Sequence, residues 1–328
     1  MELILNTFGT SLNRDNQGFV ITNQDGRQRI PVQGIRSIQI GKGAQITSDA
    51  VMLAIDNEID VVFMDRSGTP KGRIWSPQYG SISTIRKGQL AFSMSTDALT
   101  WIKSILIQKI DNQQALLMML PESKDETMCE NLHKAAAKLN YYRQRIEEIS
   151  EPQLVSDVAS TLRGFEGMAS KLYFEVISMY MPEDYRFESR SQHPAKDVFN
   201  AFLNYGYGIL YSRVECELIK AGVDPYIGIL HRDEYNRPVL AFDVIEIYRI
   251  WVDYVVCNLM MQRVVTDEYY SVLEDGSHWL ETLGRKVVIQ SLNDYMEEIV
   301  SVKSLSRSRS TQIQLQAQDL AQTFKKYQ

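Results

Sequence analysis

Short apolar runs separated by polar turns dominate the first 80 positions of the chain. The runs are rich in Ile, Val, Thr and Phe, a composition that favours strands over helices. We expect strands at residues 3–8, 18–22, 29–32, 35–40, 60–64 and 71–75. One helix is expected from about Thr47, because Thr-Ser-Asp is typical of a helix start. Residues 1–80 are therefore predicted to form a β-rich domain.

The periodicity changes after residue 90. Apolar residues now recur every three or four positions, as they do on the buried face of a helix. We expect long helices at residues 128–149, 155–181, 197–221, 243–264 and 280–300. The fold class predicted from the whole pattern is a multidomain α+β protein. A linker at 81–90 leads to a larger all-helical domain at 91–302, and 303–328 is expected to be a basic, flexible tail.

Composition supports two domains and argues against a membrane or a secreted protein. The chain has 328 residues, of which 44% are apolar and 23% are charged. No apolar run reaches the length of a membrane span, since residues 251–265 are interrupted by Asp253 and other polar residues. Met1 to Asn6 lacks the basic residues that open a signal peptide. Three scattered cysteines indicate a reducing compartment.

Charge is distributed unevenly along the chain. The net charge of −6 by itself disfavours indiscriminate coating of nucleic acid. Residues 91–300 carry 32 acidic and 20 basic side chains, whereas residues 1–90 and 301–328 have net charges of +2 and +4. An acidic middle segment suits metal capture, and a shaped basic groove can still bind phosphate.

Three residues stand out as candidate metal ligands. Glu166 lies between Gly164 and Gly167, His231 ends an apolar stretch, and Glu246 lies within another. Two carboxylates and an imidazole can hold one hard divalent cation and leave positions open for phosphate oxygens. Phosphodiester chemistry is therefore the leading interpretation of these residues.

Each candidate also has an ordinary explanation. A glycine inside a helix costs about 1 kcal/mol relative to alanine, and close helix packing would offset this cost as well as a ligand would. A single histidine after an apolar run is more often a core or surface residue. Asp243 can serve as a helix N-cap, and Glu246 can be solvated or paired with Arg249. Residue types and spacing alone leave these alternatives open.

Four segments resemble the motifs of a known family, and they occur in the order of that family. They are GFEGMA at 164–169 followed by Tyr173-Phe174, NAFLNYGY at 200–207, AGVDPYIGILH at 221–231 and LAFDVIEIYR at 240–249. Together they resemble the CRISPR-associated integrase and endonuclease family, the universal first CRISPR-associated protein of spacer acquisition. The resemblance covers nearly the whole chain up to about residue 302.

The resemblance implies a β-sandwich-like N-terminal domain that pairs two subunits and an all-α catalytic domain. It implies a prokaryotic, cytoplasmic enzyme that inserts short DNA fragments into a CRISPR array by 3′-hydroxyl transesterification. The implied metal ligands and catalytic residues are Glu166, His231 and Glu246, with Asp243 as an alternative to Glu246, and the implied cofactor is Mg²⁺ or Mn²⁺. The implied partners are double-stranded and branched DNA, a second copy of the chain, and the small second CRISPR-associated protein, whose dimer bridges two integrase dimers.

Eight basic residues near the motifs are candidates for DNA contacts. They are Arg73, Arg86, Lys87, Lys171, Arg190, Arg232, Arg237 and Arg249. Ordinary surface charge is the alternative explanation for each of them. An alternative function for the same site is that of a general metal-dependent nuclease or resolvase acting on branched DNA.

Overall fold

The computed structural model describes residues 2–35, 37–65, 70–74, 82–120, 125–192, 194–231, 237–302 and 305–327. The chain divides into two compact units. The first comprises Met1–Gln89, Ser212–Pro225 and Gln316–Gln328, and the second comprises Leu90–Tyr211 and Tyr226–Leu315. No described helix is long and apolar enough to cross a membrane. The domain boundaries expected from the sequence stay a prediction.

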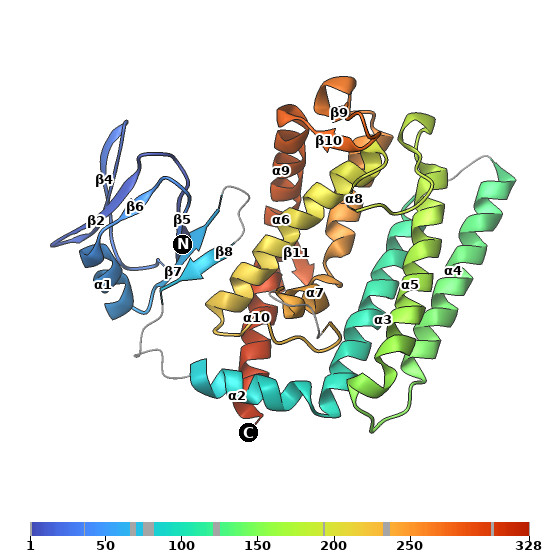
Figure 1. The fold of residues 1–328 in the computed structure, drawn as a ribbon, viewed down its shortest axis with the longest axis horizontal. Coiled ribbons are helices and arrows are strands. Elements are labelled where there is room, and N and C mark those ends of the chain that lie inside the picture. Colours follow the sequence, from blue (N-terminus) through green and yellow to red (C-terminus); the bar gives the residue numbers. More distant parts are fainter. Residues whose placement is uncertain are drawn as a thin grey trace. The chain divides into compact units, whose positions relative to one another are not determined.

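Two four-stranded sheets form the N-terminal part of the first unit (Figure 1). One sheet has the order β1 (Glu2–Leu5), β5 (Ser37–Ile40), β7 (Asp60–Met64) and β8 (Pro70–Arg73). Its first three strands are parallel and β8 is antiparallel to β7. The other sheet has the order β4 (Gly26–Ile30), β3 (Gly18–Asn23), β2 (Ser11–Asp15) and β6 (Gln45–Ile46).

Both sheets contribute to one core. Leu12 and Phe19 from the second sheet and Ile38 from the first are fully buried in the same apolar cluster as Ala50 of α1 (Ser48–Asp56). Thr47 begins α1 as the sequence predicts, because its hydroxyl accepts a hydrogen bond from the amide of Ala50 at 3.3 Å. The short apolar runs of this region therefore supply a core that the two sheets share.

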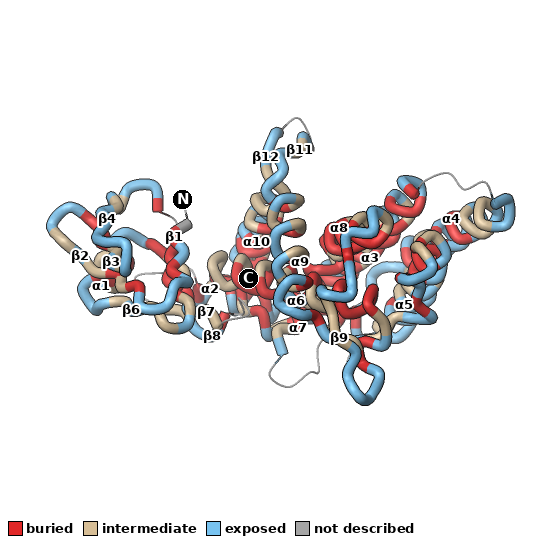
Figure 2. Tube along the Cα trace, turned by 90° about the horizontal axis from the view of Figure 1, so that it is seen from above, coloured by how far each residue is buried: buried red, intermediate tan, exposed pale blue. Residues whose placement is uncertain are grey.

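Helices make up most of the second unit. Helices α3 (Asp97–Met118), α4 (Glu126–Glu147) and α5 (Val155–Tyr180) pack against one another, and α8 (Arg249–Met261) packs on α3 and α9 (Thr282–Glu297). Buried positions, red in Figure 2, follow α3 and α8. Helix α6 (Val198–Lys220) begins in this unit.

Three features differ from the sequence-based expectation. The C-terminal region is mostly but not entirely helical, because it contains two antiparallel hairpins, β9 (Tyr270–Val272) with β10 (His278–Leu280) and β11 (Ile299–Val302) with β12 (Leu305–Ser308). Helix α2 (Ile82–Ser93) starts inside the expected linker. The expected flexible tail is instead α10 (Arg309–Lys326), one side of which is buried.

The predicted helix at 243–264 is broken in two. Helix α7 (Val239–Ile245) ends at Glu246, and α8 begins three residues later at Arg249. The Asn112 side chain on α3 donates a hydrogen bond at 2.9 Å to the carbonyl of Ile247, within the break. The Asn112 side chain thus donates to a carbonyl that would accept a backbone amide in a continuous helix. The break leaves Glu246 at a helix end rather than inside a helix.

Candidate active site

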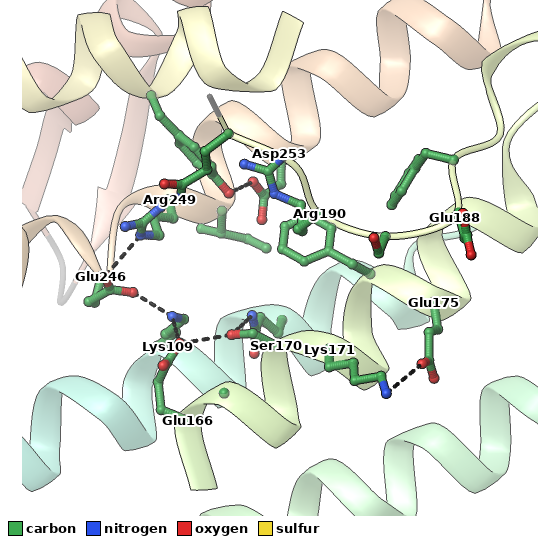
Figure 3. Close-up of a pocket in the computed structure, with 18 of the residues that line it drawn as sticks. Lys109, Glu166, Ser170, Lys171, Glu175, Glu188, Arg190, Glu246, Arg249 and Asp253 are labelled. Atoms are coloured by element: carbon green, nitrogen blue, oxygen red, sulfur yellow. Dashed lines mark hydrogen bonds and ion pairs between the residues drawn. The ribbon is translucent and has the colours of Figure 1, made fainter. Parts of the chain in front are cut away.

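The three candidate ligands meet at one cavity in the second unit. Glu166 comes from α5, Glu246 from the break between α7 and α8, and His231 from the segment before α7. All three line a cavity of about 480 Å³. Figure 3 shows Glu166 and Glu246 on opposite sides of Lys109. Residues that lie up to 80 positions apart in the sequence are therefore neighbours in the fold.

Lys109 of α3 lies between the two carboxylates. Its ammonium forms an ion pair with Oε1 of Glu166 and lies 2.5 Å from Oε2 of Glu246. Its side chain is only 8% exposed. Burial disfavours the charged ammonium, yet the Glu246 and Glu166 carboxylates together hold the pKa of Lys109 above its ordinary value. Lys109 is therefore a charged group of the site.

Glu246 is almost entirely buried and remains ionised. Burial alone would raise its pKa, but Arg249 and Lys109 lower the pKa of Glu246 to about 2. Arg249 Nε donates to Oε1 at 2.9 Å, whereas Oε2 has an ion pair with Lys109 but no hydrogen bond. The pairing of Glu246 with Arg249 that the sequence left open is thus present, and the other buried oxygen lies against the Lys109 ammonium.

Asp243 holds His231 in place from behind the cavity. Oδ1 of Asp243 lies 2.7 Å from Nδ1 of His231 and accepts the backbone amide of the same residue at 3.2 Å. Its Oδ2 accepts the amides of Ile229 and Leu230 at 2.7 and 3.1 Å. Asp243 is therefore not the N-cap that the sequence allowed, since it lies inside α7 and binds the segment that carries His231.

One ring nitrogen of His231 remains available to a ligand in the cavity. The contact with Asp243 occupies Nδ1, which leaves Nε2 as the nitrogen that can coordinate a ligand. Burial lowers the pKa of His231, but the hydrogen bond and charge of Asp243, with Glu246 and Glu166, raise it overall. Gly228 makes this tight segment possible, because a Cβ there would collide with the carbonyl of His231 and with Val239.

The glycines beside Glu166 do not mark a close helix crossing. A Cβ built on Gly164 or Gly167 meets no other atom within 4 Å. Gly167 lines the cavity and Gly164 does not. The packing explanation for these two glycines is therefore not supported by the structure, and a ligand that approaches Gly167 remains as a reason for its lack of a side chain.

Two arginines flank Tyr207 at the cavity. The guanidinium carbon of Arg249 lies 4.7 Å and that of Arg190 lies 5.7 Å from the centre of the Tyr207 ring. Arg190 binds the side-chain oxygens of Asn200 and Asn204, and it forms no ion pair with any described acidic residue. Burial accordingly lowers the pKa of Arg190 from its ordinary value. A guanidinium with only neutral partners in an open cavity is suited to bind an anion.

Asp253 also lines the cavity and binds the tyrosine that the two arginines contact. The hydroxyls of Tyr207 and Tyr173 donate to its two carboxylate oxygens at 2.5 and 3.0 Å. Burial raises the pKa of Asp253 to about 6, although the two tyrosines, Arg249 and Arg190 oppose this. This network fixes the ring on which both guanidinium groups lie.

The basic residues proposed for DNA contacts separate into three groups. Lys171, Arg190 and Arg249 line the cavity. Arg73, Arg86 and Lys87 belong to the other unit, where Arg73 binds Asp60 at 2.7 Å, Arg86 lies 3.7 Å from Asp224, and Lys87 is exposed. Arg237 is exposed and is not among the lining residues, and Arg232 lies outside the described residues.

The donor atoms at the cavity suit a hard divalent cation. Two carboxylates and an imidazole nitrogen are oxygen and nitrogen donors that Mg²⁺ and Mn²⁺ accept, and Glu246 Oε2 is a buried oxygen without a hydrogen bond. Within the described ranges, however, no three His, Cys, Asp or Glu side chains are already arranged to hold a metal ion. The Lys109 ammonium lies between the two carboxylates instead.

Sequence reasoning overlooked several cavity residues, and one pattern could have revealed two of them. Lys109 and Gln113 are four residues apart on the apolar face of α3, which otherwise carries Leu99, Ile102, Ile105, Leu106, Ile110, Leu116 and Leu117. Both are buried. A polar pair spaced by one helical turn on an apolar face predicts a buried polar site. Asp253 was similarly visible as an acid in an apolar helix.

Comparison with known proteins identifies the family. The family model for the CRISPR associated protein Cas1 matches residues 3–294. The chain belongs to the Cas1 family. A Cas1 protein from Archaeoglobus fulgidus named "CRISPR-associated endonuclease Cas1 1" is 31% identical over 332 residues, which cover 98% of this chain and 95% of the relative.

Solved structures share the Cas1 fold with this chain. The chain superposes with a TM-score of 0.75 and 22% identity on a structure described as "Partial Cas6-RT-Cas1--Cas2 complex", covering 100% of this chain and 96% of the other. It superposes with a TM-score of 0.74 and 21% identity on "Casposase bound to integration product", with the same coverage. At these identities the similarity establishes the fold.

Proposed function

We propose that this Cas1-family chain is a divalent-metal-dependent DNA integrase. It would join the 3′-hydroxyl ends of short DNA fragments to a CRISPR array by transesterification. The observation that carries the proposal is that Glu166, His231 and Glu246 line one cavity together with Arg190 and Arg249. The names of the relatives, an endonuclease in one case and a casposase bound to an integration product in another, are consistent with phosphodiester chemistry.

The reaction exchanges one phosphodiester bond for another. The 3′ oxygen of the incoming strand attacks a phosphorus atom at the repeat boundary, and the bond from that phosphorus to the 3′ oxygen of the repeat strand breaks. The attacking hydroxyl gives up its proton and the leaving 3′ oxygen takes one up, so one phosphodiester bond forms for the one that breaks and protons balance. A bound divalent cation supplies Lewis acidity at the phosphate and lowers the cost of ionising the attacking hydroxyl.

The residues of the chain hold and orient the reacting groups. Glu166 and Glu246 offer carboxylate oxygens and His231 offers Nε2 to the cation, while Asp243 fixes the imidazole ring. Arg190 has only neutral partners and is suited to bind a non-bridging phosphate oxygen. Arg249 is already paired with Glu246, so its main role would be to hold that carboxylate in position.

The proposal also includes a protein partner, a paired assembly and a DNA substrate. Structural similarity to a complex that contains Cas1 and Cas2 supports a small Cas2-type partner. In the proposed assembly, a dimer of this partner would bridge two integrase dimers. The β-rich residues 1–80 would form a sandwich-like domain that pairs two subunits, and duplex or branched DNA would be the substrate. Light scattering of the chain alone and with such a partner tests the assembly.

An integration assay with defined donor ends tests the activity. Donor DNA with free 3′ hydroxyls should be joined to a plasmid that carries a repeat when Mn²⁺ or Mg²⁺ is present. Donors with blocked 3′ ends should not be joined. Glu166→Ala should abolish joining and leave DNA affinity largely unchanged. Glu148→Ala, which removes an exposed carboxylate paired with Arg145, is the matched control.

Nicking of branched DNA that does not depend on the donor 3′ hydroxyl would favour a general nuclease or resolvase instead. Unchanged joining by the Glu166→Ala variant would contradict the ligand assignment altogether.

A further inference from the structure

Lys109 binds the same two carboxylates that are assigned to the divalent cation. Its ammonium pairs with Glu166 Oε1 and with Glu246 Oε2, the latter at 2.5 Å. A magnesium ion takes carboxylate oxygens at about 2.0–2.1 Å and needs a well-formed octahedral shell. A cation drawn to these oxygens would meet the positive charge of the ammonium and would compete with it for the same carboxylates.

Lys109 differs from the other residues that contact the two carboxylates. Ser170 donates to Glu166 Oε1 at 2.9 Å, and Arg249 donates to Glu246 Oε1. Among the described residues, Lys109 is the one whose ion pairs reach both carboxylates, and it is the charged neighbour of Glu246 Oε2. Figure 3 shows the ammonium directed into the space between them.

We propose that Lys109 is a positioning residue that competes with the divalent cation for Glu166 and Glu246 and thereby sets the metal affinity of the site. This inference rests on the proposed function, because it takes these two glutamates as metal ligands. Lys109 keeps the two carboxylates together by its positive charge. Metal binding is then opposed by the ammonium, which already occupies one oxygen of each carboxylate.

The competition predicts that loss of Lys109 strengthens metal binding. Without the ammonium, the buried Glu246 and the partly buried Glu166 carboxylates repel each other, and a cation from solution becomes the group that can offset this repulsion. Removing a unit positive charge a few ångströms from a divalent cation also removes direct repulsion, so we expect affinity to rise about tenfold or more. A lysine with only a structural role would leave the affinity unchanged.

The test compares Mn²⁺ binding and thermal unfolding in the full chain. Lys109→Met should lower the dissociation constant for Mn²⁺ by about tenfold or more, measured by titration calorimetry. It should also lower the unfolding midpoint without added metal, and Mn²⁺ should raise that midpoint by more than in the wild type. Lys109→Arg restores a cation and should return both quantities toward the wild type.

Lys103 provides the matched control on the same helix. It is a largely buried lysine that pairs with Glu151 at 3.0 Å and does not line the cavity. Lys103→Met should lower stability without a change in Mn²⁺ affinity. If Lys109→Met does not fold, Lys109→Gln replaces the ammonium with a neutral polar group and should show the same gain in affinity.

The outcomes separate this inference from the proposed function. Mn²⁺ binding by the wild type with equal or weaker binding by both neutral Lys109 variants overturns the competition and keeps the metal site. Failure of wild-type and Lys109-variant proteins alike to bind Mn²⁺ overturns both. Equal binding by wild type and Glu166→Ala removes the ligand assignment, and with it the role given to Lys109.

Discussion

The imidazole of His231 and the carboxylate of Asp243 form a fixed pair, with Nδ1 and Oδ1 2.7 Å apart and Asp243 fully buried. Three backbone amides donate to the same carboxylate, from residues 229, 230 and 231. Asp243 therefore fixes both the orientation of the ring and the path of the chain that carries it. These four donors use the lone-pair directions of both oxygens, so Asp243 has none left with which to coordinate a metal ion.

Asp243→Asn should weaken the metal site without removing a ligand. Asparagine has one acceptor oxygen where four donors converge, so the ring of His231 loses its fixed orientation. We expect metal affinity and strand transfer to fall about 10- to 100-fold, as is typical for a residue that supports a ligand. Calorimetric titration with Mn²⁺ measures the change. Complete loss of binding, equal to that of Glu246→Ala, would instead identify Asp243 as a ligand.

Arg190→Gln should weaken DNA binding in a way that does not depend on sequence. Arg190 has amide partners and forms no ion pair with a described carboxylate, so its guanidinium is available to a phosphate. We expect affinity to fall about tenfold and the slope of log affinity against log salt to decrease by about one. Fluorescence anisotropy over a series of salt concentrations measures both.

Arg145 supplies the control for that measurement. It is half exposed, pairs with Glu148 and does not line the cavity. Arg145→Gln should leave the salt slope unchanged. An equal decrease in slope for both variants would mean that the effect of Arg190 is one of general surface charge.

The residue types of the site could be read from the sequence, but its internal contacts could not. Glu166, His231 and Glu246 stand in recognisable motifs, and all three line the cavity. The ion pairs of Lys109 depend on how α3 packs beside α5 and on the break after α7. That break contains no glycine or proline, only Glu246, Ile247 and Tyr248, so local propensity gives no signal for it.

For the C-terminal helix, by contrast, the sequence does contain a helical signal, but the composition of the segment before it favours a flexible tail. Serines and arginines at 304–310 favoured a flexible tail, but Ile313, Ala317, Leu320 and Phe324 recur at helical spacing just beyond them. All four are buried on one side of α10. Hydrophobic periodicity over about three turns was therefore a better guide than composition over seven residues.

The stability of the fold should depend on pH through Asp253. Burial raises its pKa in the folded protein to about 6, against 3.8 ordinarily, so the folded state binds the proton more tightly than the unfolded state. The stability from this group is present at low pH and is lost as pH rises from about 4 to 6, by at most a few kcal/mol. Asp253→Asn removes this dependence. Urea unfolding at pH 4.5 and 7 should show the variant gaining relative to the wild type at the higher pH, and a constant difference would contradict the assignment.

Gly164 and Gly167 differ in whether they line the cavity, so substitutions at the two positions can distinguish an effect on stability from an effect on activity. Both lie in α5, and a Cβ at either position would meet no atom within 4 Å. Only Gly167 lines the cavity beside Glu166. Alanine at either position should therefore be accepted by the fold, but only one of the two methyl groups would project toward a bound phosphate backbone.

Gly164→Ala and Gly167→Ala should each raise the free energy of unfolding by roughly 0.5–1 kcal/mol, because alanine loses less backbone entropy in a helix. Strand transfer should be unchanged in Gly164→Ala and should fall in Gly167→Ala, with most of the loss in DNA affinity rather than in the rate at saturation. Urea unfolding and integration at several DNA concentrations measure the two effects. Equal activity in both variants would mean that no ligand approaches Gly167 closely, and the absence of a side chain there would then be unrelated to the site. A destabilised Gly167→Ala would instead point to a packing contact at this turn of α5.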